Sequence, residues 1–230
     1  MNSNNNKTTA SSSIWLGVVV VGLLFVGGVC WGMWPVNHSA SGLSQRDFTM
    51  DIDFDKFRKI MVRKNATEAI VAHSGMKLLK EKVDELSIDI PKQKRPILNA
   101  VLGRSKADIS ASKQITVSLE NPDIDVKEMI LNQHVQIDSE LMDVTSQASE
   151  PAGNLTAYST RLRATKCDAG TKVELTINQS VNVSVPKFFV SEADRKVQQA
   201  AENSTAEQEK AIRSFISLYQ NDAIILPDLH

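Results

Sequence analysis

The chain has 230 residues, with 26 Lys and Arg, 27 Asp and Glu, and a formal net charge of −1 at pH 7. Because this near-zero charge gives no overall field that would attract nucleic acid, the composition argues against a nucleic-acid partner. The charge is unevenly placed, since residues 56–106 contain 13 basic and 5 acidic residues and the chain beyond them is acidic. Of the two cysteines, Cys30 lies within an apolar segment and Cys167 stands alone, so no disulfide framework is expected.

Residues 14–34 form an uncharged, mainly apolar segment near the start of the chain. The segment is long enough to cross the hydrocarbon core of a bilayer as a helix. Trp15, Trp31 and Trp34 lie near its ends, where tryptophan favours the membrane interface. Because the segment is longer than the apolar region of a typical signal peptide and no good cleavage site follows, we predict an uncleaved membrane anchor.

The anchor predicts a single-pass membrane protein. A short polar N-terminus weakly favours a cytoplasmic start, although Lys7 and Arg46 provide almost no positive-inside bias. The rest of the chain is then extracytoplasmic, and its lack of a cysteine framework favours a bacterial periplasm. The predicted organisation is a cytoplasmic tail at 1–13, the transmembrane anchor at 14–34, a polar linker at 35–46, one domain at 47–218 and a C-terminal tail at 219–230.

The first part of the domain combines a strand pattern with a helical one. Alternating apolar and acidic residues over 48–54 predict a strand, and apolar residues at helical spacing over 56–75 predict a helix in two pieces. Residues 76–90 fit a helix and a strand equally well. Because the predicted linker is short, the basic residues after it are expected to face anionic lipid; they are Lys56, Arg58, Lys59, Arg63 and Lys64. The alternative is that they form a solvated face of the fold.

From residue 108 onward the apolar period changes to two, which predicts antiparallel strands at about 108–119, 129–137, 141–144 and 158–164. Residues 173–185 form the clearest strand, whose apolar face is interrupted only by Gln179. Its wet opposite face indicates an antiparallel sheet, and its unusual length indicates strong curvature. A helix is predicted over 191–218, with an inner stripe that is small at first and bulky later: Val197, Ala200, Ala201, Ser204, Ala211, Ile212, Phe215 and Tyr219.

Sequence motifs of catalysis are missing. The chain contains no glycine-rich phosphate loop, no paired-cysteine motif and no hydrolase or metalloprotease signature. Its histidines, His38, His73, His134 and His230, lack metal-ligand spacing, and His134 is expected to be exposed. We therefore predict no cofactor, no metal site and no catalytic residue, and we favour a binding protein over an enzyme, although catalytic groups can also assemble from distant positions.

The order of a strand, a short helical region, a run of antiparallel strands and one long C-terminal helix resembles the START/polyketide-cyclase-like superfamily, also called helix-grip or SRPBCC. The best local match runs from Gly170-Thr-Lys-Val through Val185-Pro-Lys-Phe-Phe189 into the helix at Ser191. The resemblance covers about residues 46 to 218 and implies an α+β fold, in which a curved antiparallel sheet grips the C-terminal helix. It also implies an apolar ligand in a cavity between sheet and helix. A minority of the family catalyse cyclisation or dehydration, and no family catalytic residue maps onto this chain.

The resemblance and the small residues of the helical stripe together predict a domain that binds a lipid or another apolar small molecule. The expected contacts are Val173, Leu175, Ile177, Gln179, Val181, Ala200, Ala201 and Ser204. In this interpretation Gln179 orients the polar end of the ligand. The alternative is a structural or interaction domain of the cell envelope with a filled core, in which alanine lets helix and sheet approach closely and Gln179 bonds to backbone. The expected partner is membrane lipid, and no protein partner is predicted.

Overall fold

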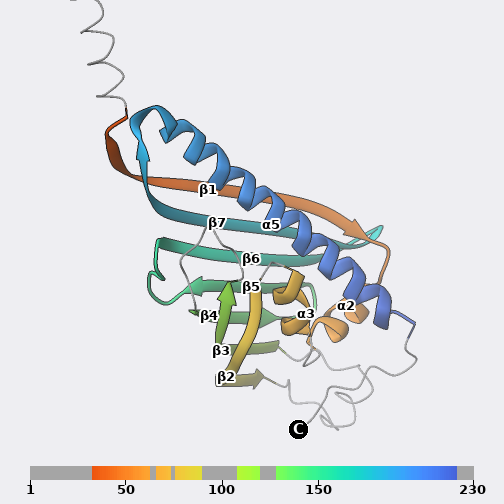
Figure 1. The fold of residues 1–230 in the computed structure, drawn as a ribbon. Coiled ribbons are helices and arrows are strands. Elements are labelled where there is room, and N and C mark those ends of the chain that lie inside the picture. The colour runs from red at the N-terminus through yellow and green to blue at the C-terminus, as the bar shows by residue number, and fades with distance from the viewer. Residues whose placement is uncertain (1–32, 63–65, 74–75, 90–107, 120–127, 222–230) are drawn as a thin grey trace, which may run out of the picture.

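The computed structural model describes residues 33–62, 66–73, 76–89, 108–119 and 128–221. Figure 1 shows one curved sheet with a long helix lying across it. In chain order the elements are β1 (Pro35–Met50), α2 (Phe54–Met61), α3 (Ala66–His73), β2 (Met76–Asp89), β3 (Asp108–Leu119), β4 (Met129–Ile137), β5 (Leu141–Ala148), β6 (Leu155–Cys167), β7 (Gly170–Pro186), the 3-10 helix η1 (Lys187–Phe189) and α5 (Val190–Tyr219).

Seven strands of the described chain form one antiparallel sheet in the order β1-β7-β6-β5-β4-β3-β2. From β2 to β7 each strand pairs with the next one along the chain, and the first strand pairs with the last. The helix α5 lies along β1 and β7 on what we call the inner face of the sheet, with α2 and α3 beside its C-terminal half (Figure 1). This arrangement confirms the predicted α+β fold with a curved sheet and a long C-terminal helix.

Residues 35–46, predicted as a polar linker, form the first part of β1 and pair without interruption with β7. Inward-facing Ala40 and Ser44 are buried, whereas the residues beside them along the strand are exposed. The backbone of α5 passes so close that a Cβ added at Gly42 would lie 2.5 Å from the carbonyl oxygen of Val197. Because this close approach requires small inward residues rather than large apolar ones, the strand shows no apolar alternation, and the linker prediction was wrong.

The segment predicted as a strand over 48–54 contains the end of β1 and the start of α2. Asp53, expected on a wet strand face, is instead the N-cap of α2, and its carboxylate accepts hydrogen bonds from the backbone N–H groups of Asp55 and Lys56. The helical region is in two pieces, α2 and α3, as predicted, and the ambiguous segment at 76–90 proves to be β2.

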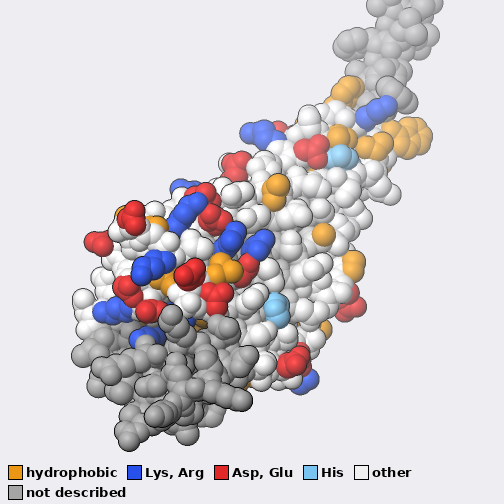
Figure 2. All heavy atoms as spheres, turned by 180° about the vertical axis from the view of Figure 1, so that it is seen from behind, with side chains coloured by type: hydrophobic (Ala, Val, Ile, Leu, Met, Phe, Trp, Pro, Cys, Tyr) orange, Lys and Arg blue, Asp and Glu red, His pale blue; other side chains and the backbone are white. Residues whose placement is uncertain are grey.

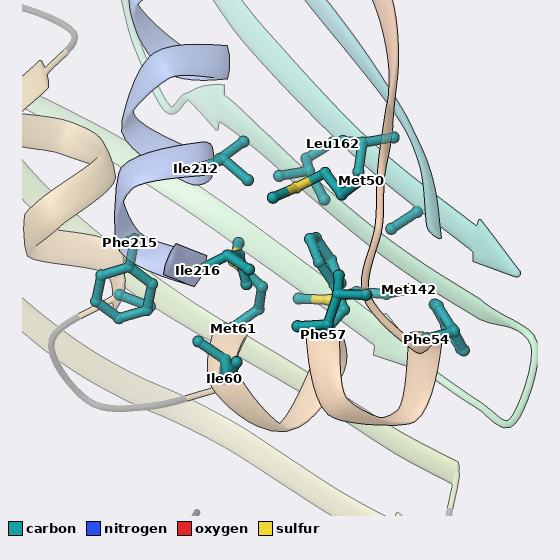
Figure 3. Packing of buried hydrophobic residues seen from close by; sticks show 14 of the residues in the cluster. Met50, Phe54, Phe57, Ile60, Met61, Met142, Leu162, Ile212, Phe215 and Ile216 are labelled. Carbon is teal, nitrogen blue, oxygen red and sulfur yellow. The ribbon is translucent and has the colours of Figure 1, made fainter. Parts of the chain in front are cut away.

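Two apolar clusters occupy the inner face of the sheet. The helix cluster packs α2 and the C-terminal half of α5 against the sheet, and Figure 3 shows their side chains facing one another; its members include Met50, Phe54, Phe57, Ile60, Met61, Met142, Leu162, Ile212, Phe215 and Ile216. The sheet cluster lies farther along the strands and consists of Met76, Ile115, Val117, Met129, Leu131, Leu155, Tyr158, Ile177 and Val181. Burial of each large apolar side chain stabilises the fold by about 1.5–3 kcal/mol.

The predicted anchor at 14–34 lies outside the described residues except for Met33 and Trp34, which directly precede β1. The tail at 1–13 also lies outside them. Among the helices within the described ranges, none is long and apolar enough to cross a membrane. The membrane span therefore stays a prediction.

Candidate functional site

The eight residues predicted to contact a ligand do not all face the same space. Val173, Leu175, Ile177, Gln179 and Val181 are buried on the inner face of β7, and Ala201 is buried on α5. Ser204 is half-buried, and Ala200 is exposed, so its place in the inner stripe was predicted wrongly. The buried side of α5 also includes two polar residues, Thr205 and Gln208, which the predicted inner stripe did not contain because they are not apolar.

The N-terminal half of α5 is held tightly against β1 and β7. The Nε2 atom of Gln179 donates a hydrogen bond to the carbonyl oxygen of Val197 at 3.1 Å. The side chain of Gln198 accepts from the backbone N–H of Leu43 at 3.1 Å and donates to its carbonyl oxygen at 3.0 Å. With the Gly42 contact, these bonds bring helix and strand together where the small residues were expected to leave space. The geometry at this point is that of the filled-core alternative.

A row of polar side chains crosses the inner face farther from α5. Lys113 on β3, Gln133 on β4, Ser146 on β5 and Thr160 on β6 are successive cross-strand partners. Side chains two residues apart on a strand share a face. Gln133 therefore points to the same side as buried Leu131. We call these four residues the inner polar row.

The inner polar row separates the two apolar clusters. On β6, Leu162 of the helix cluster and Tyr158 of the sheet cluster flank Thr160. On β4, Gln133 has Leu131 of the sheet cluster on one side. The same order recurs on β5 around Ser146, between Met142 and Ala148. A continuous polar band thus lies where a filled core would carry apolar residues.

Hydrogen bonds satisfy much of this band. The Nζ atom of Lys113 donates to Thr67 Oγ1 at 2.7 Å and to Glu81 Oε1 at 2.5 Å, and these bonds join β3 to α3 and β2. The Lys113 side chain is only 15% exposed, and a charge so little solvated requires a partner such as Glu81. Nearer the middle of the sheet, Gln133 Nε2 donates to the oxygen of buried Ser146 at 2.9 Å.

Tyr158 provides a further polar group beside the row. Its side chain is buried in the sheet cluster, and burial raises the pKa of its phenol far above the ordinary value, so the group stays neutral. Within the part of the chain that the structure describes, no hydrogen bond joins this hydroxyl to another residue, and its oxygen is not among the fully buried unpaired atoms, so the tip of the side chain still reaches solvent. A neutral phenol in apolar surroundings is a hydrogen-bond donor for the polar group of a ligand.

Sequence analysis missed the inner polar row and Tyr158 as site residues, although a signal was present. Lys113 occupies the same strand parity as Ile115 and Val117, and Gln133 interrupts the apolar face of 129–137. Taken alone, each of these two residues is one polar exception on the apolar face of a strand. Only the register of β3, β4 and β5 shows that these exceptions are neighbours.

A groove on the opposite, outer face of the sheet has a volume of about 550 Å³. It is lined mainly by uncharged polar side chains, with His134 exposed and its Nδ1 atom 3.2 Å from the hydroxyl of Ser112. The guanidinium of Arg161 in this groove is already paired with Asp143. Figure 2 shows the molecule from behind, with many acidic and basic side chains interspersed over part of this surface. The lining of this groove includes the four residues of the inner polar row but, among the described residues, no apolar one that could hold the body of a small ligand. The inner face carries two apolar clusters and is therefore the better candidate.

The basic residues expected at a membrane surface do not lie beside the start of the domain. Lys56, Arg58 and Lys59 are on α2, and Arg63 and Lys64 lie outside the described residues. β1, which has 16 residues, separates α2 from Pro35 by about 50 Å at a rise of about 3.3 Å per residue.

Arg58 has a local structural role on α2. Its guanidinium pairs with Asp55 at 2.8 Å and donates to the carbonyl oxygen of Asp138 at 2.7 Å. The argument from a short linker therefore fails, because the segment that was to keep these charges near the membrane is a long strand.

Within the described ranges no group of three or more His, Cys, Asp or Glu side chains could hold a metal ion. Cys167 is a free, half-buried cysteine at the end of β6. The chain residues that could hold a ligand are therefore those of the inner polar row, Tyr158 and the apolar side chains on either side.

No protein-family model and no curated protein matches the sequence. Similar solved structures include an aromatase/cyclase from Streptomyces sp. R1128, with a TM-score of 0.43 and 10% identity over 81% of this chain and 98% of that one. A protein of unknown function from Staphylococcus aureus has a TM-score of 0.44 and 8% identity over 81% and 98%. Norcoclaurine synthase from Thalictrum flavum has a TM-score of 0.41 and 12% identity over 80% and 99%.

These identities and TM-scores are low, so nothing about activity or ligand is transferred from those proteins. What classifies the chain is its own topology. The strand order, the antiparallel pairing throughout and the long helix across β1 and β7 show a helix-grip fold.

Proposed function

We propose that this domain binds an amphipathic small molecule on the inner face of its sheet. The polar group of the ligand lies at the inner polar row, and its apolar part lies against the sheet cluster. One observation carries the proposal: a hydrogen-bonded polar band, including a largely buried lysine, crosses the interior between two apolar clusters. A predominantly apolar surface with a few convergent polar groups is the usual character of a small-molecule site.

The charges at the row favour a neutral ligand. Glu81 compensates the charge of Lys113, and Tyr158 is un-ionised. The remaining groups are an amide and two hydroxyls, which offer hydrogen bonds and no net charge. Transfer of a carboxylate or phosphate from water to this site would cost free energy, because the site offers no uncompensated positive charge to pair with it. We therefore propose a neutral lipid or similar molecule that carries hydroxyl or carbonyl groups.

The proposal includes a location. The apolar segment at 14–34 anchors the chain in a membrane as a single helix, with residues 1–13 cytoplasmic and the domain extracytoplasmic. Its length and lack of charge support this, together with the start of β1 at Pro35 directly after it. In this arrangement the domain receives its ligand from the membrane or the surrounding envelope.

A second candidate function is a structural or interaction domain of the envelope with no ligand. The close contact at Gly42 and the bond from Gln179 to Val197 favour it, because they close the space between β7 and α5. In that case the inner polar row acts only to fix strand register, since a polar side chain that slipped out of line would lose its partner.

The two candidates differ in what the purified full chain carries. The test extracts bound molecules from detergent-purified protein and measures their amount per protein by mass spectrometry. Thr160→Val and Ser146→Ala each remove a hydroxyl from the inner polar row. Thr176→Val and Thr145→Ala are the matched controls, because they remove a hydroxyl from the outer face of the same sheet at nearby positions. Loss of one hydrogen bond of about 1 kcal/mol lowers affinity roughly fivefold.

We expect the two inner variants to retain several-fold less of a neutral lipid than the parent, and the two outer variants to match the parent. A parent that carries no stoichiometric molecule under any extraction would favour the structural alternative. Equal retention by inner and outer variants would place the ligand elsewhere.

A further inference from the structure

An exposed aromatic patch lies at one tip of the domain. Trp34 is 71% exposed, Phe188 is 62% exposed and Phe189 is 53% exposed. Met33, also exposed, precedes Trp34 in the chain. Of the other large apolar side chains that are exposed in the described ranges, three lie along β2, and one each lies on β1, just after α2 and on α5. The grouping of four exposed large apolar side chains distinguishes this tip from the rest of the described surface.

Pairing of the first and last strands assembles the patch. Pro35 and Pro186 are cross-strand partners at the ends of β1 and β7. The residues just before β1 and the residues of η1 just after β7 therefore meet at one end of the sheet, although about 150 positions separate them in sequence. Figure 2 shows hydrophobic side chains gathered at the end where the described chain begins, with a basic side chain beside them.

The chemistry of the tip is that of a membrane interface. Tryptophan and phenylalanine place large rings at the boundary between headgroups and acyl chains, and lysine keeps its charge in the headgroups while its stem lies along apolar surface. Lys187 of η1 is exposed between Pro186 and the two phenylalanines. Trp34 contributes from the opposite strand.

The chain itself indicates what covers this patch. The residues that precede Met33 in sequence are uncharged and mainly apolar from Ile14 onward, and β1 starts at Pro35. No spacer residues separate the apolar segment from the patch. If the segment crosses a bilayer, as proposed above, the tip lies within a few ångströms of the same membrane surface.

We propose that the tip formed by Met33, Trp34, Lys187, Phe188 and Phe189 is seated in the phospholipid interface of the membrane that anchors the chain. This rests on the proposed anchoring and adds a second contact formed by η1. Two contacts, one just before β1 and one just after its neighbour β7, fix how the domain stands. β1 then leads away from the bilayer, and α2 lies at the distant end (Figure 1). The domain stands on its tip rather than rotating freely about a tether.

The test uses the full chain in vesicles that contain brominated phosphatidylcholine, which quenches tryptophan fluorescence in the bilayer. All three tryptophans precede β1, so Trp15→Phe, Trp31→Phe and Trp34→Phe give a dark background that keeps an aromatic ring at each position. Phe188→Trp and, separately, Phe189→Trp place the probe at the tip. Leu218→Trp is the matched control, because Leu218 is 68% exposed near the other end of α5.

We expect strong quenching and a blue-shifted emission for both tip probes, and quenching at least about threefold weaker for the control, since bromine acts only at short range. Flotation of the same vesicles reports the anchor separately. Protein that floats with the vesicles but shows equal quenching at tip and control overturns the seated tip and leaves the anchor standing. A blue shift without quenching means that protein, such as a second copy, covers the patch, and this also overturns the proposal. Protein that fails to float overturns both.

Discussion

Gly42→Ala is the sharpest test of how closely α5 lies on the sheet. The added Cβ would lie 2.5 Å from the carbonyl oxygen of Val197, 2.8 Å from its carbonyl carbon and 3.0 Å from the Cα of Gln198. Real Cβ atoms are normally 3.4–4 Å from such neighbours, so helix and strand must separate by close to 1 Å. Every atom in the clash is backbone, and no side chain can turn aside.

The separation has a calculable cost. It would stretch the 3.1 Å bond from Gln179 to Val197 and the 2.8 Å bond between Ser44 and Thr205. Overpacking of a close contact costs about 1–3 kcal/mol. A glycine replaced by alanine also gains about 0.4–1 kcal/mol from the unfolded state, because Gly42 does not have the positive φ that would add strain. The net expectation is a loss of about 1–2 kcal/mol, or roughly 2–8 °C in Tm for a chain of this size.

The assay is thermal unfolding of the full chain in mild detergent, followed by far-ultraviolet circular dichroism. Ser39→Ala is the matched control, because Ser39 is exposed on the opposite face of the same strand, and the Tm of this variant should stay within about 1 °C of the parent. A Gly42→Ala protein as stable as the parent, or more stable, would refute the close contact. It would mean that space exists between β1, β7 and α5, where the sequence had placed the ligand.

Three further outcomes follow from single interactions. Lys113→Met should lower the free energy of unfolding by about 1–3 kcal/mol, because it leaves the half-buried carboxylate of Glu81 without its partner. Adding Glu81→Gln to this variant removes that charge and should recover part of the loss. Urea unfolding of the parent and the two variants measures both effects. Because burial raises the pKa of Tyr158, the folded protein should lose stability as pH rises above about 10, where the unfolded phenol ionises, and Tyr158→Phe should lose less over the same range. Burial works against ionisation of Glu209, but hydrogen bonds from Arg213 and Arg46 outweigh it and lower its pKa. Its carboxylate therefore stabilises the fold above pH 4.5 and loses that effect as pH falls, so Glu209→Gln should flatten the acid side of a plot of Tm against pH.

The sequence predicted the fold better than the site. Residues 173–185 alternate so regularly that one buried face and an antiparallel sheet follow from them alone, and β7 confirms both. The helix over 191–218 was also predicted nearly to its ends. The first part of β1 was missed because its inward positions are filled by Ala40, Gly42 and Ser44, which carry no apolar signal. Such residues become meaningful only when the position of α5 is known.

The residues of the candidate site were harder to predict, because their positions depend on the rotation of a helix and on the register of the strands, which the sequence does not determine. The first is the rotation of α5, which buries Ala201 and exposes Ala200, one residue away. Because both residues are alanine, residue type did not indicate which of the two is buried. The second is strand register, which aligns Lys113, Gln133 and Ser146 across three strands that are separated by turns and by residues outside the described ranges.

The inner polar row connects these findings to function through its effect on stability. A domain with no ligand would gain from apolar residues at such positions, since apolar side chains of similar volume often stabilise a core in which polar groups were buried. Thr160 lies between Leu162 and Tyr158, so its replacement by valine keeps the shape and removes one hydroxyl. We expect Thr160→Val to be at least as stable as the parent while it carries less ligand. That result would mean that the hydroxyl lowers stability, and a binding function would then explain its place between two apolar clusters. A Thr160→Val protein that is clearly less stable would show instead that the hydroxyl holds the sheet together, and the structural alternative would then account for the row.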